Sequence, residues 1–189
     1  MIMCTFKIIA VTNRHLCSRP LTEQLARIAS VNKPDLVMLR EKDLSEEAYQ
    51  ELAEKVTACC MRLEIPCVLH TYAGVARRLA CPALHLPFSL FQEQWKEMGE
   101  FEMCGTSVHS AKEAVWAQEH NAAYVTAGHI FATDCKPGLP PRGLSYLEDI
   151  CAAVEIPVYA IGGVTEQNLN LIRKTKAAGA CLMSSMMKI

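Results

Sequence analysis

The sequence predicts one α/β domain, residues 1–189, folded as a closed (β/α)8 (TIM) barrel, and two observations support this prediction. First, short apolar runs recur eight times along the chain. Most of them lack strict alternation, as is typical of parallel strands that are covered on both faces. Second, helical patterns separate these runs, about seven in all. An open, doubly wound sheet is the alternative that the pattern alone leaves open.

The expected strands are short stretches of mainly apolar residues. They are Phe6–Val11, Leu36–Leu39, Cys67–Leu69, Ala83–Leu86, Met103–Ser107, Tyr124–Ala127, Pro157–Ile161 and Ala180–Met183.

Three serines are typical of helix starts. Ser45 precedes two glutamates and an apolar face with helical spacing, which predicts an N-cap. Ser110 with Glu113, and Ser145 with Glu148, have the S-x-x-E spacing of a capping box.

The end of the chain departs from a regular barrel. Thr165 predicts the start of a further helix and Gly179 its end. Only Ser184–Ile189 follow the last expected strand, so we expect the final barrel helix to be missing or shortened.

Composition narrows the possible function classes. A net charge of -1 offers no basic footprint, so we expect no nucleic-acid partner. No apolar run reaches the roughly 20 residues of a membrane span, and the first residues lack a basic signal-peptide region, which favours a cytoplasmic protein without membrane contact. The ten cysteines form no C-x-x-C pair and the six histidines do not cluster, so we expect no metal site.

In a barrel, the chemistry lies where the strands end. After the sixth expected strand, a long loop over residues 128–143 contains a histidine, a threonine, an aspartate, a lysine and an arginine among glycines and prolines. Loops of this length in a compact chain are usually functional or disordered, and the density of polar groups favours function.

The ends of strands seven and eight predict a phosphate site. Gly162 and Gly163 follow one strand, and Met183, Ser184 and Ser185 follow the other. Small residues leave backbone N–H groups accessible to an anion, although a glycine pair can also be only a tight turn.

Four cations are candidates for holding an anionic substrate in the same mouth. Arg40 and Lys42 end strand two, and Lys136 and Arg142 lie in the long loop. Surface pairing with acidic neighbours is the alternative for the first two, and Arg142 can instead tie the loop down.

His129 is the candidate acid–base residue. It follows Gly128 and opens the long loop, and an imidazole both takes and gives a proton near neutrality. His109 is the competing candidate, while Ser107, Thr133 and Cys135 are further polar residues at these strand ends.

These residues resemble the thiamine phosphate synthase superfamily over nearly the whole chain. The shared motifs are L-R-E-K (Leu39–Lys42), S-V-H-S (Ser107–Ser110), A-I-G-G-V-T (Ala160–Thr165) and L-M-S-S (Leu182–Ser185). The resemblance implies a barrel that acts on thiazole phosphates. True synthases join a thiazole phosphate to a pyrimidine diphosphate with Mg²⁺, held by N-D after strand three and an aspartate after strand four. Here His70 and Thr71 occupy the first place, and Cys81–Gln92 contains no carboxylate.

The long loop reads G-H-I-F-A-T-D-C-K, which is similar to the TenI-like thiazole tautomerase branch. That resemblance implies an isomerase that aromatises a carboxylated dihydrothiazole phosphate with a histidine as proton carrier, no metal or other cofactor, a thiazole phosphate as small-molecule partner, and a possible homodimer. Two alternatives remain open, a thiamine phosphate synthase (a transferase) and a non-catalytic regulator that binds thiazole phosphate.

Overall fold

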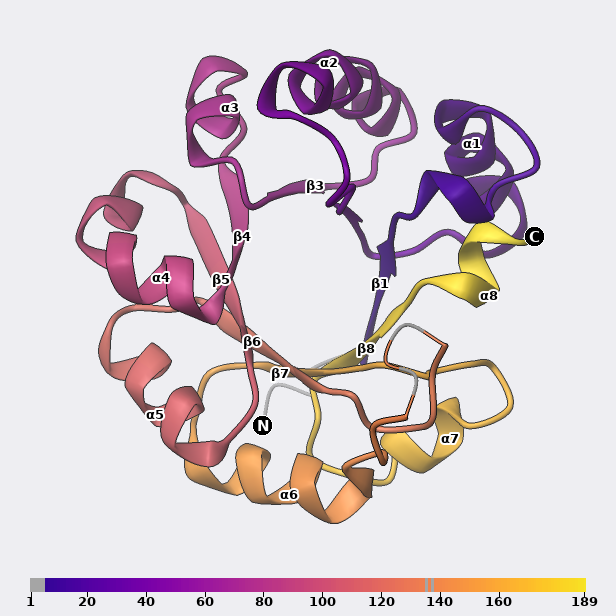
Figure 1. The fold of residues 1–189 in the computed structure, drawn as a ribbon. Coiled ribbons are helices and arrows are strands. Elements are labelled where there is room, and N and C mark those ends of the chain that lie inside the picture. The colour runs from indigo at the N-terminus through magenta and orange to yellow at the C-terminus, as the bar shows by residue number, and fades with distance from the viewer. Residues whose placement is uncertain (1–5, 135, 137) are drawn as a thin grey trace.

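A computed structural model of the chain describes residues 6–134, 136 and 138–189. Within this part, eight parallel strands pair in sequence order and close on themselves, which confirms the (β/α)8 barrel and excludes the open sheet. Figure 1 shows the helices as an outer ring around the strands. All strands point the same way, so their carboxyl ends meet at one mouth.

The strands agree with the sequence prediction to within one residue at each end. They are β1 Lys7–Val11, β2 Leu36–Leu39, β3 Cys67–His70, β4 Ala83–Pro87, β5 Met103–Val108, β6 Tyr124–Gly128, β7 Val158–Ile161 and β8 Gly179–Leu182.

Helical segments follow the strands along the chain. They are η1 Arg14–Leu16, α1 Leu21–Asn32, α2 Glu46–Arg62, α3 Ala73–Arg78, α4 Phe88–Gln94, η2 Trp95–Glu100, α5 Ala111–Glu119, α6 Gly143–Ala153, α7 Leu169–Ile172 and α8 Ser184–Met187.

Two of the predicted helix starts are confirmed. The Ser45 hydroxyl accepts the N–H of Ala48 at 3.3 Å, and the Ser110 hydroxyl accepts the N–H of Glu113 at 3.1 Å. The Glu113 carboxylate accepts the N–H of His109 at 2.6 Å, so it closes the turn one residue earlier than the standard capping box.

The predicted start at Ser145 is wrong, because α6 already begins at Gly143. The long loop fixes this start: the N–H groups of Arg142 and Gly143 donate to the carbonyls of His129 and Ile130, both at 3.0 Å. Backbone pairing within the loop therefore takes the place of a side-chain cap.

The predictions at Thr165 and Gly179 are also wrong. Asn168 accepts the N–H of Thr165 at 2.9 Å and donates to the carbonyl of Gly163 at 2.8 Å, which makes a turn before α7 starts. Gly179 begins β8 rather than ending a helix. A Cβ there would lie 2.1 Å from the carbonyl oxygen of Lys7, so the close approach of β1 requires glycine.

The final helix is shortened, as the sequence predicts. α8 is a single turn of four residues that lies beside α1 in Figure 1. The amide of buried Gln24 in α1 donates to the carbonyl of Met186 at 2.9 Å and joins the two segments.

Apolar side chains fill two layers. A small cluster lies within the barrel, and a larger one packs between the strands and the surrounding helices. The inner cluster of buried residues consists of Ile9, Val11, Met38, Tyr124 and Cys181. In the described residues, no helix is long and apolar enough to cross a bilayer.

Candidate functional site

A cavity of about 240 Å³ opens at the carboxyl ends of the strands. Most of the sequence-predicted site residues line it: Arg40, Lys42, Ser107, His109, His129, Thr133, Lys136, Gly162, Gly163, Met183 and Ser184. Ser185 and Arg142 do not line it, and Cys135 lies outside the described residues. The residues that were predicted from their places at strand ends thus meet in one cavity, and they come from five different strand ends.

The β7 end is formed by close backbone approach. Gly162 has φ +95° and Gly163 has φ +66°, a region that L side chains rarely adopt. A Cβ on Gly162 would lie 2.3 Å from the Cβ of His129, and one on Gly163 would lie 2.3 Å from the carbonyl oxygen of Ala132. The glycine pair thus lets the long loop pack directly on the end of β7.

The ends of β7 and β8 form one wall of the cavity, the β7–β8 wall, and described backbone N–H groups there have no backbone partner. Those of Gly162, Gly163 and Ser184 donate to no carbonyl in the described part of the chain. Neither α7 nor α8 is longer than four residues, and α7 begins only at Leu169, so the expected helix N-terminus directly after the glycine pair is not formed. Any anion here would be held by individual N–H groups and not by a long helix.

The long loop is tied down by hydrogen bonds at both ends. Its first residues pair with β7, with Ile130 N–H on Ile161 O and Phe131 N–H on Gly162 O, both at 3.0 Å. Arg142 ends the loop: its guanidinium donates to the carbonyl of His109 at 2.8 Å and lies over the ring of Tyr146. These contacts fit the loop-tying alternative for Arg142.

His129 is 6% exposed and follows a cis peptide bond with Gly128. Its Nε2 lies 3.3 Å from the carbonyl oxygen of Leu139. Because a carbonyl only accepts, Nε2 carries the proton in this contact.

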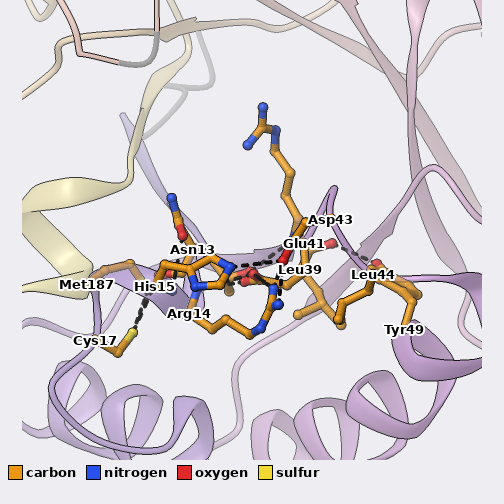
Figure 2. A network of polar contacts seen from close by, with 12 residues as sticks. Asn13, Arg14, His15, Cys17, Leu39, Glu41, Asp43, Leu44, Tyr49 and Met187 are labelled. Carbon is orange, nitrogen blue, oxygen red and sulfur yellow. Dashed lines mark hydrogen bonds and ion pairs between the residues drawn. The ribbon is translucent and has the colours of Figure 1, made fainter.

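At the β2 end, Glu41 organises the residues on either side of it (Figure 2). Glu41 is 3% exposed. Its carboxylate accepts hydrogen bonds from the Thr12 hydroxyl at 2.7 Å, the N–H of Arg14 at 3.0 Å and the Arg14 guanidinium at 3.1 Å. The Thr12 hydroxyl oxygen also accepts the N–H of Arg40 at 3.0 Å. The ends of β1 and β2 are thereby locked together, which fixes the backbone that presents Arg40 and Lys42.

Asp43 extends this network toward solvent (Figure 2). It pairs with Arg14 and lies 2.9 Å from Nε2 of His15. Hydrogen bonds from Arg14 hold the pKa of Asp43 well below its usual range, and donation to the Asp43 carboxylate raises the pKa of Arg14. Because Asp43 and His15 are mostly exposed, this outer pair contributes less than the buried Glu41 contacts.

The cations in the cavity lie close enough to affect one another. Burial lowers the pKa of Lys42, and the charges of Arg40 and Lys136 lower it further. No aspartate or glutamate is among the described residues that line this cavity. The mouth is therefore electropositive and suited to an anionic ligand.

Sequence reasoning missed a buried histidine pair. His70 and His85 are neighbours in the register of β3 and β4, and their rings stack with centroids 5.3 Å apart. His70 Nδ1 lies 2.5 Å from the Thr71 hydroxyl, while His85 lies 3.0 Å from the Tyr124 hydroxyl and 2.8 Å from that of Ser107. A polar residue near the end of each apolar strand was the available signal.

Both imidazoles are neutral near pH 7. Burial is the main cause that keeps the pKa of His70 well below its usual value, and the positive charges of Arg40 and Lys42 add to it. Burial and the charge of Arg40 lower the pKa of His85 to about 3. His70 faces the main cavity and also a second one of about 240 Å³, whose other lining residues are Glu41, Lys42, Tyr49, Thr71, Tyr72 and Pro87.

Comparison with known proteins assigns the chain to a family. The model of the family described as thiamine monophosphate synthase matches residues 8–186. The chain belongs to the thiamine monophosphate synthase family.

Named relatives agree with this family. Thiamine-phosphate synthase of Enterococcus faecalis is 34% identical over 188 residues, which cover 96% of this chain and 86% of that protein. Thiamine-phosphate synthase 2 of Streptococcus pneumoniae is 30% identical over 185 residues, covering 94% and 86%. The structure of thiamine phosphate pyrophosphorylase from Pyrococcus furiosus matches with a TM-score of 0.82 and 25% identity, over 97% of this chain and 88% of that one.

The prediction of a thiazole tautomerase is wrong. These relatives carry the names of synthases, which favours the alternative of a transferase and supports an enzyme of thiamine biosynthesis. The loop motif misled because it covers nine positions, whereas the likeness to the synthases extends over 188 aligned residues. The catalytic assignment of His129 stays a prediction.

The Mg²⁺ that the family implies does not fit the side chains of this mouth. Mg²⁺ prefers an octahedron of oxygen ligands and usually takes one or two carboxylates. In the described residues, no group of three or more histidines, cysteines, aspartates and glutamates is placed to hold a metal ion. Glu41, which lines a neighbouring cavity, already accepts hydrogen bonds from Thr12 and Arg14.

Proposed function

We propose that this chain is a thiamine phosphate synthase, a transferase that joins a thiazole phosphate to a pyrimidine diphosphate. In this reaction, the thiazole ring nitrogen forms a bond to the exocyclic carbon of the pyrimidine. The bond between that carbon and the diphosphate oxygen breaks, and diphosphate leaves with its electron pair. Both substrates are anionic and one product is diphosphate, so the site must above all hold negative charge.

The electropositive mouth, free of acidic lining residues in its described part, carries this proposal. Arg40, Lys42 and Lys136 place three cations along one cavity. Cations that line a cavity with low-dielectric walls attract an anion more strongly than the same cations on an open surface. Family membership supplies the identity of the anions.

We assign the two phosphate-bearing ends to opposite walls of the cavity. The thiazole phosphate lies against Gly162, Gly163 and Ser184, where backbone N–H groups have no backbone partner. The diphosphate lies against the cations of the β2 end and the long loop. The reacting atoms then meet between the walls, beside Ser107 and His129.

Ser107 is the better supported of these two central residues. Its hydroxyl lies 2.8 Å from His85 and accepts the Thr126 hydroxyl at 3.0 Å, so it has a defined orientation. His129 remains a candidate catalytic residue, and its proton on Nε2 is committed to Leu139 in this conformation.

The assay uses the purified full chain with a synthetic thiazole phosphate and pyrimidine diphosphate, in Mg²⁺ and separately in EDTA. We expect thiamine phosphate in at least one condition, with one diphosphate released per product, measured by chromatography and a diphosphate assay. Lys42→Met should lower kcat/KM by roughly ten- to a hundredfold, because it removes a charge-assisted contact. Lys112→Met, an exposed lysine of α5 outside the cavity lining, is the matched control and should change little.

A second function is favoured by one observation, the poor fit of the mouth to Mg²⁺. A binder of thiazole phosphate without turnover would need only the β7–β8 wall. Thiazole phosphate binding without product in either condition would establish this second function and refute the synthase.

We also propose that residues 1–189 work as one barrel domain. A homodimer remains a proposal, which sedimentation would test.

A further inference from the structure

The side chains at the ends of β3 and β4 differ in kind from the carboxylates that usually bind Mg²⁺. Mg²⁺ usually takes one or two carboxylates, and the chain instead presents His70, Thr71 and the buried imidazole of His85 there. Both nitrogens of His85 already lie within hydrogen-bond distance of hydroxyls, those of Tyr124 and Ser107. His85 therefore has no ring nitrogen left for a metal or a ligand.

His70 has one ring nitrogen left for a ligand. Its Nδ1 is engaged by the Thr71 hydroxyl, which leaves Nε2 on a ring that lines both cavities. When the Thr71 hydroxyl donates to Nδ1, the neutral ring carries its proton on Nε2. His70 then offers an N–H donor, which suits a phosphate oxygen and cannot bind a metal.

The backbone at Thr71 is consistent with a dedicated role. Thr71 has φ +74°, an uncommon conformation for a β-branched residue. Asparagine and aspartate adopt it more readily, and they lack the combination of hydroxyl donor and short reach that holds His70. The contact with His70 is the interaction that the structure shows for the Thr71 side chain at this uncommon φ.

Charge at this wall also disfavours a divalent cation. Arg40 and Lys42 are near enough to lower the pKa of His70, and Lys42 lines both cavities. Glu41 is the one carboxylate among the described residues that line either cavity, and it is buried in its contacts with Thr12 and Arg14. Asp134 of the long loop is exposed and does not line the cavity.

We propose that this chain binds the diphosphate group without a divalent cation, and that the Nε2–H of His70 donates to it beside Arg40 and Lys42. Side-chain cations and one neutral donor thereby neutralise and orient the group that Mg²⁺ serves elsewhere in the family. The substrate class rests on the proposed function, whereas metal-free binding of a diphosphate does not require turnover.

The direct test is calorimetry of the full chain with inorganic pyrophosphate at pH 7.5, in EDTA and in millimolar Mg²⁺. We expect saturable binding in EDTA that Mg²⁺ leaves unchanged or weakens, because the metal only competes for free pyrophosphate. Binding that appears only with Mg²⁺, or that Mg²⁺ strengthens threefold or more, would overturn the proposal.

Two variants test the donor itself. His70→Leu keeps the approximate volume and removes the N–H, so pyrophosphate affinity in EDTA should fall about tenfold. His70→Gln retains an amide donor at a similar reach and should keep most of the affinity. His120→Asn changes a histidine that does not line the cavity, so this control should bind as the wild type does. Equal affinity of the Leu and Gln variants, both folded by circular dichroism, would remove His70 from the proposal.

A gain-of-function variant completes the test. His70→Asn combined with Thr71→Asp introduces the carboxylate that a metal needs, at a φ that aspartate tolerates. We expect its pyrophosphate binding to be weak in EDTA and restored by Mg²⁺. If Mg²⁺ does not restore it, the two residues do not decide metal dependence and the proposal fails.

The outcomes separate this inference from the proposed function. Pyrophosphate binding in EDTA without thiamine phosphate formation would support the inference and refute the synthase. Product formation and pyrophosphate binding that both require Mg²⁺ would support the synthase and refute the inference.

Discussion

The two walls of the cavity present different groups to a ligand, backbone N–H groups on one side and charged side chains on the other. At the β7–β8 wall, Gly162 and Gly163 bring backbone against backbone, and small residues leave N–H groups exposed to a ligand. At the opposite wall, formed by the ends of β2–β4 and the long loop, the charged side chains of Arg40, Lys42 and Lys136 line the cavity, and Glu41 and Thr12 fix the backbone at the end of β2. Ligand binding at the first wall should depend on close backbone packing, and ligand binding at the second wall should depend on charge. Different substitutions should therefore affect the two walls.

The largest expected effect is a loss of stability from a substitution in the β7–β8 wall. Gly163→Ala places a Cβ 2.3 Å from the carbonyl oxygen of Ala132, at φ +66°. Backbone strain and overpacking together should lower the free energy of unfolding by about 2–5 kcal/mol. Urea denaturation measures this loss.

Gly99→Ala is the matched control for that change. A Cβ on Gly99 meets no atom within 4 Å, and the residue lies in η2 with an ordinary φ. Its stability should stay the same or rise by up to about 1 kcal/mol. Equal losses in the two glycine variants would show that close packing of the loop does not set the shape of the β7 wall.

An intermediate effect tests the support of the second wall. Glu41→Gln keeps the shape but replaces an acceptor oxygen with an amide that faces the donors of Thr12 and Arg14. We expect a loss of about 2–3 kcal/mol in unfolding free energy, because buried donors lose a charged partner. Pyrophosphate affinity should also fall, whereas thiazole phosphate affinity at the opposite wall should not.

Asp43→Asn is the control, because it alters the exposed half of the same network. It should cost much less stability and leave both affinities unchanged. A Glu41→Gln variant that weakens both ligands equally would mean that the walls are not independent.

The fold was predictable because apolar runs report burial directly. Each strand of the barrel is covered on both faces, so runs such as Leu36–Leu39 stand out from their surroundings. Most cavity residues followed from the rule that chemistry lies at strand ends, without any knowledge of side-chain geometry. The helix start at Gly143 was not predictable, because loop carbonyls and not a local motif fix it.

The histidine pair and the catalysed reaction were harder for a different reason. His70 and His85 are separated by 14 residues and meet only through the register of β3 and β4. The loop motif around His129 pointed to an isomerase, while the whole-chain likeness points to synthases. A few residues at one loop do not determine which substrates the opposite wall of the cavity accepts.

The smallest expected effect sharpens the comparison through pH. Burial, Arg40 and Lys136 lower the pKa of Lys42 from its ordinary value of 10.5, so this lysine loses its charge at a lower pH than an exposed one. A neutral lysine no longer attracts an anion, so pyrophosphate affinity should fall as pH rises above neutrality toward that value. We expect a loss of about three- to tenfold, the worth of one charge-assisted contact.

Lys42→Arg is the control, because arginine stays charged over this pH range. The ligand's own ionisation affects the wild type and the variant equally, so the ratio of their two affinities reports the charge of Lys42 alone. That ratio, measured by calorimetry between pH 7.5 and pH 10, should change for pyrophosphate and stay constant for a phosphate monoester bound by the N–H groups of the β7–β8 wall. A constant ratio for pyrophosphate would show that Lys42 does not contact the diphosphate, and the charge of the second wall would then rest on Arg40 and Lys136.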